Sequence, residues 1–304
     1  MPNGHSTLRL SKLIPFKTVK AIHYVRRMHG SSQSQLMLCS DGNLYIVKFR
    51  NNPQHRRVLC NEMLGTQIAR FLGLPVPPAA IIEVSQKLID KTPAMRIDLS
   101  GATVAFEPGL HFASRHVLQK FRGEVYDFFP SKKLHLVANL QDFAGALAFD
   151  LWTCNADARQ AIFTRPAWMS TYHATFIDQG NCFNGQDWDR LDQAFRGVYR
   201  DLSVYSHVSP RQVSRWASRI RDFDMGLIRA VCDIIPTSWY DNEHRELENL
   251  VERLEHRRQG ICEVLHKAFS PSTGLPVGMS LAQFLPLGRK FGIECGQTAN
   301  LQLP

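Results

Sequence analysis

Residues 35–49 read QLMLCSDGNLYIVKF, and this stretch decides how the first part of the chain folds. Two runs rich in strand-forming residues, 35–39 and 44–49, stand on either side of Asp41-Gly42. An Asp-Gly pair between such runs is a strong signal for a β-hairpin, because glycine tolerates the positive φ that the turn requires. The sequence therefore predicts a hairpin whose second strand carries one charged residue, Lys48.

A small polar segment precedes this hairpin, since residues 30–34 read Gly-Ser-Ser-Gln-Ser. Such a segment can bring backbone N–H groups close to a phosphate, although an ordinary flexible turn is the simpler interpretation when the segment is taken alone. Gly30, Ser31 and Ser32 are the candidate phosphate contacts.

A helix and two further strands are expected after the hairpin. Residues 56–72 carry apolar side chains at helical spacing and end before Gly73, which predicts a helix. The proline-rich segment 73–78 excludes helix and leads into a strand at 79–84, and another strand is expected at 102–106. The first 110 residues therefore predict a small sheet with one helix packed against it.

The second part of the chain predicts mainly helices. One apolar helical face recurs over 140–152, Ser209-Pro210 is a good start for a helix to about residue 222, and residues 247–265 predict a long amphipathic helix. Two short strands, 161–164 and 172–177, are expected between them. The fold class is therefore α+β, with a β-rich part followed by a larger, mainly helical part.

Four segments follow from these patterns. We expect an N-terminal extension (1–18), a small β-rich lobe (19–110), a larger helical lobe (111–268) and a flexible tail (269–304), because the tail has few charges among repeated Gly and Pro.

The composition, with 44% hydrophobic and 21% charged residues, is that of a soluble globular protein. The net charge is +9, but the basic residues lie in short scattered clusters, so nucleic-acid binding is a minority expectation. The seven dispersed cysteines indicate neither a disulfide framework nor a zinc site. We find no membrane helix and no secretory signal in the sequence, which makes the cytoplasm the expected location.

Lys48 interrupts a strand that otherwise favours burial. A buried ammonium group is costly unless it is paired, and Glu62 on the following helix is the natural partner. A lysine held in this way can contact the phosphates of a nucleotide. Taken alone, a strand lysine pointing into solvent is the simpler interpretation of Lys48.

Two aspartates stand on loops beside the predicted strand pair of the second part. Asp157 follows a buried helix, and Asp178 ends an apolar strand just before Gly180. The paired strands can bring both carboxylates to one place. A base for a hydroxyl proton and a ligand for Mg²⁺ are what phosphoryl transfer needs.

Taken in order, these features resemble the HipA-like kinases, in a compact branch without the N-terminal extra subdomain of HipA toxins. The resemblance covers residues 20–265. It is carried by Tyr24-Val25-Arg26-Arg27-Met28, Tyr45-Ile46-Val47-Lys48-Phe49, Asn61-Glu62, Leu72-Gly73-Leu74-Pro75-Val76-Pro77, Asn155-Ala156-Asp157-Ala158 and Phe176-Ile177-Asp178-Gln179-Gly180.

The resemblance implies a two-lobed protein-kinase-like fold and gives each candidate residue a role. Lys48 would hold the α- and β-phosphates of ATP with Glu62 orienting it, Asp157 would be the catalytic base, and Asp178 would bind Mg²⁺. The strand near Phe106 and Glu107 would lead into the hinge that carries adenine.

The sequence departs from the family pattern at one position. Members usually have a metal-binding asparagine five residues after the catalytic aspartate, and that position is Ile162. Gln160 or Asn155 could supply the missing oxygen, while Arg159 fits the histidine or arginine that members carry two residues after the aspartate.

We therefore expect ATP- and Mg²⁺-dependent phosphoryl transfer to Ser or Thr of a protein substrate, with a regulatory protein as a further partner. Two alternatives stay open: a pseudokinase that binds a nucleotide or a protein, and a basic protein associated with nucleic acid.

Overall fold

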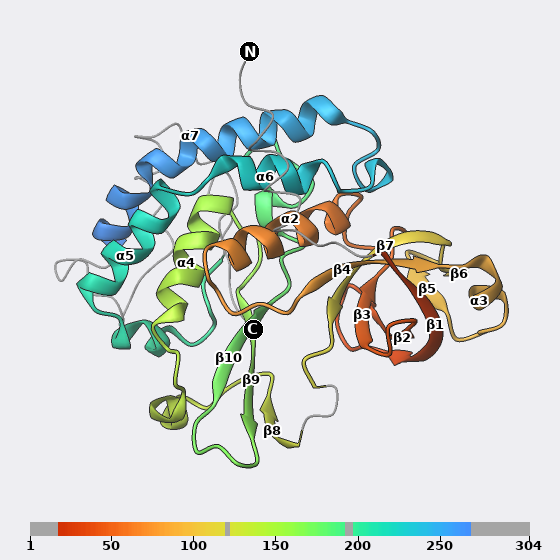
Figure 1. Ribbon diagram of the computed structural model, residues 1–304, viewed down its shortest axis with the longest axis horizontal. Helices are drawn as coiled ribbons and strands as arrows, with labels where there is room; N and C mark the ends of the chain where they lie inside the picture. Colours follow the sequence, from red (N-terminus) through yellow and green to blue (C-terminus); the bar gives the residue numbers. More distant parts are fainter. Residues whose placement is uncertain (1–17, 119–121, 192–196, 269–304) are drawn as a thin grey trace.

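The computed structural model describes residues 18–118, 122–191 and 197–268. The predicted tail and all of the predicted N-terminal extension except Thr18 lie outside these residues. The described chain forms a β-barrel on one side and a group of helices on the other, with a small sheet extending below the helices (Figure 1).

The predicted hairpin is present and forms part of a closed barrel. Leu38 pairs with Leu44, and Gly42 has a φ of +76° in the connecting turn. The barrel strands, in their order around it, are β1 (Thr18–Arg27), β2 (Gln35–Cys39), β3 (Leu44–Lys48), β7 (Gly109–Arg115) and β4 (Ala79–Val84). β1 pairs with β4 in parallel, which closes the barrel.

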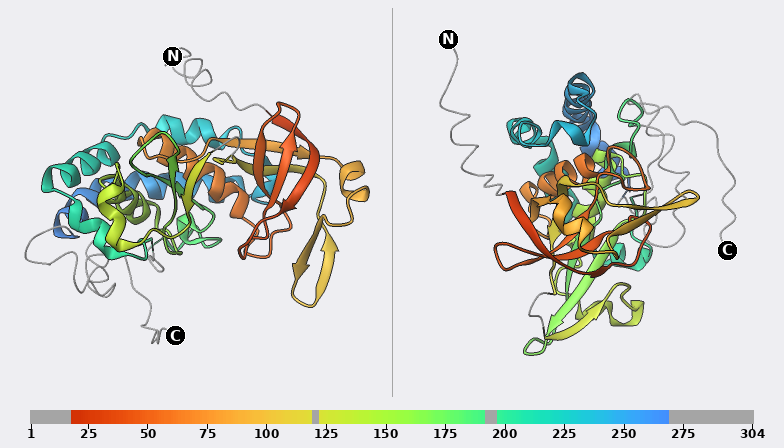
Figure 2. Two further views of the ribbon diagram at one scale, coloured as in Figure 1. Left: turned by 90° about the horizontal axis from the view of Figure 1, so that it is seen from below. Right: turned by 90° about the vertical axis from the view of Figure 1, so that its right-hand side faces the viewer.

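The strand that completes the barrel differs from the one expected. The predicted strand 102–106 corresponds to β6 (Ala102–Ala105), which pairs only with β5 (Arg96–Leu99) in a separate hairpin. This hairpin and the short helix α3 (Gln86–Asp90) form an insertion between β4 and β7 that projects from the barrel (Figures 1 and 2). The expected boundary at residue 110 is therefore wrong, because it falls inside β7, and the barrel part extends to Arg115.

Helix α2 (Val58–Phe71) lies between the barrel and the other helices. Every residue from Val58 to Ala69 is buried. The helix ends as predicted at Gly73, whose φ of +83° lets the N–H groups of Gly73 and Leu74 bond back to the carbonyls of Arg70 and Ala69. Because both sides of α2 are covered, its polar residues need partners inside the protein.

The helical part is built around α4 (Asp142–Thr153), in which every residue from Phe143 to Thr153 is buried. A Cβ at Gly145 would lie 2.3 Å from the ring of Trp216, so glycine lets α5 pack closely on α4. On α4 pack α5 (Pro210–Arg221) and α7 (His244–Ala268), and α6 (Met225–Cys232) packs on α2 and α7. The short helices include η1 (Ser131–Leu136), η3 (Leu202–His207) and η4 (Thr237–Trp239), and η4 lies beside α2. The predicted Ser209 cap on α5 is confirmed, with a full capping box to Gln212.

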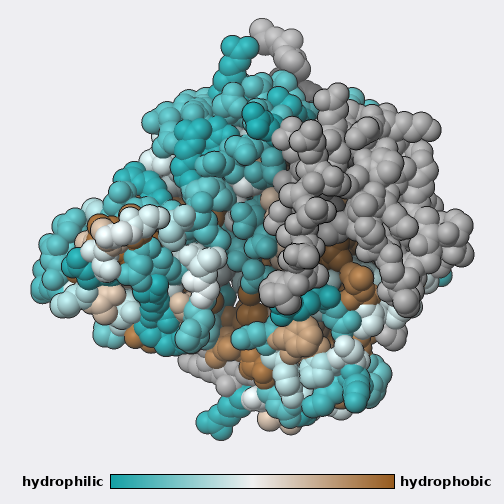
Figure 3. Space-filling model, turned by 180° about the vertical axis from the view of Figure 1, so that it is seen from behind, coloured by the Kyte–Doolittle hydropathy of each residue, from teal (hydrophilic) through white to brown (hydrophobic). Residues whose placement is uncertain are grey.

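The remaining strands form a small sheet in the order β10, β9, β8. Both predicted strands are present, as β9 (Gln160–Pro166) and β10 (His173–Ile177), and β8 (Gly123–Tyr126) joins at the edge. The face opposite to that of Figure 1 is hollowed where the barrel meets this sheet, and hydrophobic side chains show inside the hollow (Figure 3). Within the described ranges, no helix has the length and apolar character needed to cross a bilayer.

Candidate active site

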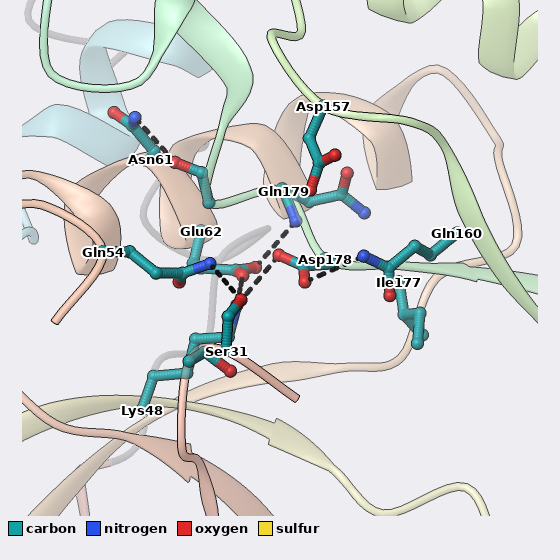
Figure 4. A network of polar contacts seen from close by, with 12 residues as sticks. Ser31, Lys48, Gln54, Asn61, Glu62, Asp157, Gln160, Ile177, Asp178 and Gln179 are labelled. Carbon is teal, nitrogen blue, oxygen red and sulfur yellow. Dashed lines mark hydrogen bonds and ion pairs between the residues drawn. The ribbon is translucent and has the colours of Figure 1, made fainter. Parts of the chain in front are cut away.

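Lys48 and Glu62 meet between the barrel and α2. Lys48 ends β3 and is 7% exposed, while Glu62 on α2 is 3% exposed. Lys48 Nζ lies 2.5 Å from Glu62 Oε1 (Figure 4). The expected pair is therefore present, and it satisfies a charge that the apolar strand could not bury alone.

Asp178 completes this cluster from the end of β10. Its Oδ1 lies 2.9 Å from Lys48 Nζ. The second oxygen of Glu62 accepts the backbone N–H of Gln179 at 3.0 Å. Glu62 therefore holds both the lysine and the loop that carries Asp178.

Burial and charge compete in this cluster. Burial alone would raise the pKa of Asp178, but Lys48 and Arg159 outweigh it and lower the pKa to about 2. Burial likewise raises the pKa of Glu62, and its contact with Lys48 opposes the rise. With two carboxylates facing one ammonium group, the ionised cluster has an excess of negative charge that favours a cation.

Gln160 faces Asp178 from the start of β9. Gln160 pairs with Ile177, the residue before Asp178. Gln160 Nε2 lies 3.4 Å from Asp178 Oδ2 (Figure 4). A half-turn of the terminal amide presents its oxygen to the same space.

The structure also accounts for Ile162. β9 begins three residues after Asp157, so the position five residues after Asp157 already lies inside the strand, where Ile162 pairs with Thr175. Counting five residues therefore points past the end of the loop. Gln160 is the polar side chain that the strand brings to Asp178.

Asp157 and Asn155 lie on the loop between α4 and β9. Asp157 is half-buried, and its Oδ1 accepts the N–H of Ala158 at 2.7 Å. Asn155 is 1% exposed, donates to Asp150 Oδ1 at 3.0 Å and accepts the N–H of Asp157 at 3.1 Å. The amide of Asn155 is thus engaged within the loop, by Asp150 and by the backbone of Asp157, which disfavours the expected role as a metal ligand.

Arg159 is the site residue whose part sequence reasoning missed. It is 3% exposed and forms a two-pronged ion pair with Asp150 on α4. It also donates to the carbonyls of Ile177 and Asp178. The signal was available: Asp150 is a charged residue within an otherwise apolar helix, and such a group needs a buried partner.

The Gly30 turn is attached to the loop that follows Lys48. Gly30 has a φ of +119°. Asn52 donates to the carbonyl of Ser32 at 2.9 Å, and Gln54 Nε2 lies 3.4 Å from Ser31 Oγ (Figure 4). The candidate phosphate-binding turn and the strand carrying Lys48 are thus linked through one loop.

Phe106 and Glu107 do not lie where the chain leaves the barrel, so their assignment to the hinge is wrong. Phe106 is 2% exposed and stacks on Phe49 with ring centroids 3.9 Å apart, and Glu107 accepts hydrogen bonds from Arg50. The chain leaves the barrel after Arg115, at the end of β7, the neighbour of β3.

This combination of a barrel, a lysine–glutamate pair and a loop aspartate beside a helical part is a kinase-like fold. The sequence model of the HipA-like kinases matches residues 21–271. The chain therefore belongs to the HipA-like kinase family. None of the curated proteins matches it in sequence.

Two solved structures share the fold. The Helicobacter pylori proinflammatory kinase CtkA is 15% identical with a TM-score of 0.53, and the match covers 83% of this chain and 98% of CtkA. HipA of Shewanella oneidensis MR-1, solved with HipB and operator DNA, is 14% identical with a TM-score of 0.52, covering 84% of this chain and 75% of that one.

Proposed function

We propose that the protein transfers the γ-phosphoryl group of ATP, with Mg²⁺ bound, to a serine or threonine hydroxyl of a protein. The observation that supports this proposal best is the single cluster in which Lys48 is paired with Glu62 and Asp178 faces Gln160. Phosphoryl transfer depends mainly on positioning and on charge neutralisation, and this arrangement can provide both. The choice of a protein acceptor rests on the family resemblance.

The side chains around Asp178 fit a magnesium ion. Asp178 offers carboxylate oxygens and Gln160 an amide oxygen, which are the hard ligands that Mg²⁺ prefers. Across the described ranges, no three His, Cys, Asp or Glu side chains converge as a preformed cage. Mg²⁺ bound through one or two carboxylates and the phosphates of a nucleotide needs no such cage. When bound, the ion would neutralise charge on the phosphate oxygens.

The remaining roles follow from position. Lys48 would contact the α- and β-phosphates, with Glu62 fixing its side chain. Asp157 would accept the proton of the attacking hydroxyl, since its contact with Ala158 N–H holds the carboxylate in one orientation. The hydrophobic hollow between the barrel and the small sheet offers a place for the adenine ring (Figure 3).

A pseudokinase is the main alternative. The argument for it was Ile162 in place of a metal-binding asparagine, and the contact between Gln160 and Asp178 weakens that argument. Turnover decides between the two.

The test compares Asp178→Asn and Asp157→Asn. We expect Asp178→Asn to lose Mg²⁺-dependent ATP binding, because a neutral amide is a weaker ligand for a hard cation. Asp157→Asn should bind Mg²⁺-ATP like the parent and lose transfer by roughly 10²–10⁴-fold, the usual effect of a general base. Calorimetry measures binding, and transfer of labelled phosphate to the protein itself or to a mixture of protein acceptors measures turnover.

Asp189→Asn is the matched control, because Asp189 is an exposed aspartate whose side chain pairs only loosely with Arg190, at 3.7 Å. It should behave like the parent in both measurements. A parent protein that binds Mg²⁺-ATP but transfers no phosphate to any acceptor would instead support the pseudokinase.

A further inference from the structure

The backbone of Asp178 has an unusual conformation. Its φ is +62°, in the left-handed region that residues other than glycine rarely adopt. Such a conformation costs free energy and persists only where surrounding contacts enforce it. It matters here because it sets the direction of the carboxylate relative to Lys48 and Gln160.

Arg159 supplies contacts on both sides of this residue. Its Nη1 lies 2.9 Å from the carbonyl of Ile177, 3.2 Å from that of Asp178 and 2.7 Å from Gln179 Oε1, so its two N–H groups are shared among three acceptors. These acceptors belong to three consecutive residues centred on Asp178. The guanidinium therefore fixes the peptide groups that flank the left-handed residue.

Arg159 is itself fixed by a helix. Its Nε lies 2.8 Å from Asp150 Oδ2, and its Nη2 donates to Asp150 Oδ1. Asp150 is fully buried and also accepts from Asn155 on the loop that carries Asp157. A planar guanidinium that binds a carboxylate with two donors has a single orientation, which lysine cannot reproduce.

We propose that Arg159, oriented by Asp150, is a positioning residue that holds Asp178 in its metal-binding conformation before the nucleotide arrives. The proposal rests on the proposed function, in that Asp178 is taken as the magnesium ligand. The same pair also connects Asp178 to the Asp157 loop, so one helix sets the positions of both aspartates.

The contacts distinguish this role from ordinary core stabilisation. A pair that served only the core would use its donors within α4 and β9. Arg159 instead directs one of its nitrogens to residues 177–179, at the end of β10 and in the loop that follows it. Removing it should therefore affect the loop beyond any loss of global stability.

The experiment measures how ADP binding depends on Mg²⁺ in Arg159→Met. We expect the half-saturating Mg²⁺ concentration to rise by about 10–100-fold, the usual effect of losing a residue that orients a metal ligand. ADP affinity in EDTA should stay within about twofold of the parent value, because the lysine–glutamate pair is intact. Hydrogen exchange at the amides of residues 178–182 should become faster. Arg159→Lys should restore only part of the effect, since it keeps the charge but not the fork.

Arg257→Met is the matched control. Arg257 also donates to two backbone carbonyls, those of Leu151 and Trp152, which follow Asp150 on α4, but neither bond reaches residues 177–179. It should lower the melting temperature without changing the Mg²⁺ dependence.

A parent-like Mg²⁺ dependence in Arg159→Met would overturn the inference while leaving the proposed function intact. If the parent protein itself binds no nucleotide, the proposed function fails instead. If Arg159→Met does not fold, Asp150→Asn decides: it keeps the volume, frees the orientation of Arg159, and must also raise the Mg²⁺ requirement.

Discussion

Gln160 and Ile162 lie two residues apart on β9. Variants at these two positions test whether the wild-type protein is fully active or is weakened by the missing asparagine. If Gln160 supplies an oxygen to the metal, Gln160→Ala should lower turnover by about tenfold or more and raise the Mg²⁺ requirement. Ile162→Asn should bring no gain, and it should destabilise the fold by about 1–3 kcal/mol if its amide finds no partner. Turnover, Mg²⁺ titration and thermal melting of both variants check this.

The control for Gln160→Ala is Gln86→Ala, because Gln86 is an exposed glutamine on α3 that bonds only Asp90 in the described structure. A rise in turnover for Ile162→Asn would contradict the placement of Gln160 and return the metal role to position 162.

At the level of single residues, the sequence predicted those whose charge would be costly to bury without a partner. Lys48 in an apolar strand needed a carboxylate, and Glu62 lies against it. The position of Ile162 inside β9 could not be predicted, because a fixed count of residues does not show where the loop ends and the strand begins. The charged Asp150 in an apolar helix indicated that a buried partner was needed. The bonds of Arg159 to the carbonyls of Ile177 and Asp178 arise from the pairing of β9 with β10, which residue spacing does not reveal.

Among the elements, α2 and the loop after Asp178 are joined through Asn61. This side chain is fully buried, and its amide nitrogen donates to the carbonyls of Gly180, Cys182 and Gly185 at 2.9, 2.9 and 2.7 Å. Its oxygen accepts the indole N–H of Trp188 at 2.9 Å. The residues that follow Asp178 are thus bonded to the helix that carries Glu62.

Asn61→Ala should therefore loosen this loop as well as destabilise the protein. The carbonyl of Gly185 and the indole of Trp188 lose their bonds to Asn61, which should cost about 1–3 kcal/mol or more. Faster hydrogen exchange across residues 180–188 and weaker Mg²⁺-dependent ADP binding are the expected results.

Asn139→Ala provides the comparison, because Asn139 is also buried and makes two hydrogen bonds with Ala174 at the other end of β10. It should lose similar stability without changing ADP binding. Equal effects of the two variants on ADP binding would show that Asn61 has no special connection to the site.

The elements themselves were largely predictable, since hairpin turns and helix caps act locally. Asp41-Gly42 and Ser209-Pro210 each fixed a boundary that the structure shares. The choice between β6 and β7 as the barrel strand was not local. β6 reads ATVA and β7 reads GLHFASR, and the pairing of β7 with β3 and β4 places it in the barrel.

For the molecule as a whole, buried histidines predict a loss of stability in mild acid. His111 is fully buried and packs against Phe49 with ring centroids 4.5 Å apart and the rings tilted by 42°, and burial lowers its pKa to about 4. His55, whose Nε2 lies 2.9 Å from the carbonyl of Gly180, has its pKa lowered to about 4 by burial as well.

The unfolded chain, with a histidine pKa near 6.5, therefore binds more protons than the folded protein between about pH 6.5 and 4. Stability should be full above pH 6.5 and fall as the pH drops through this window. In His111→Asn the slope should be smaller by up to about 1.4 kcal/mol per pH unit, because one proton is no longer taken up on unfolding. Urea unfolding at a series of pH values measures it.

His256→Asn, on the exposed face of α7, serves as the control and should keep the parent slope. If His111→Asn also keeps the parent slope, His111 is not the group that takes up the proton.

The packing of α2 on both sides has a consequence for control of the enzyme. Protein kinases are commonly switched by moving the helix that carries this glutamate. In this chain, moving α2 away from its neighbours would expose buried apolar residues, among them Leu59, Met63, Leu64 and Ile68. The free-energy cost would be on the order of 10 kcal/mol. That is comparable to the whole stability of a typical domain. We therefore do not expect the protein to be regulated by movement of α2. We expect its activity to be set by molecules that compete for the hollow between the barrel and the small sheet, or by the amount of protein present.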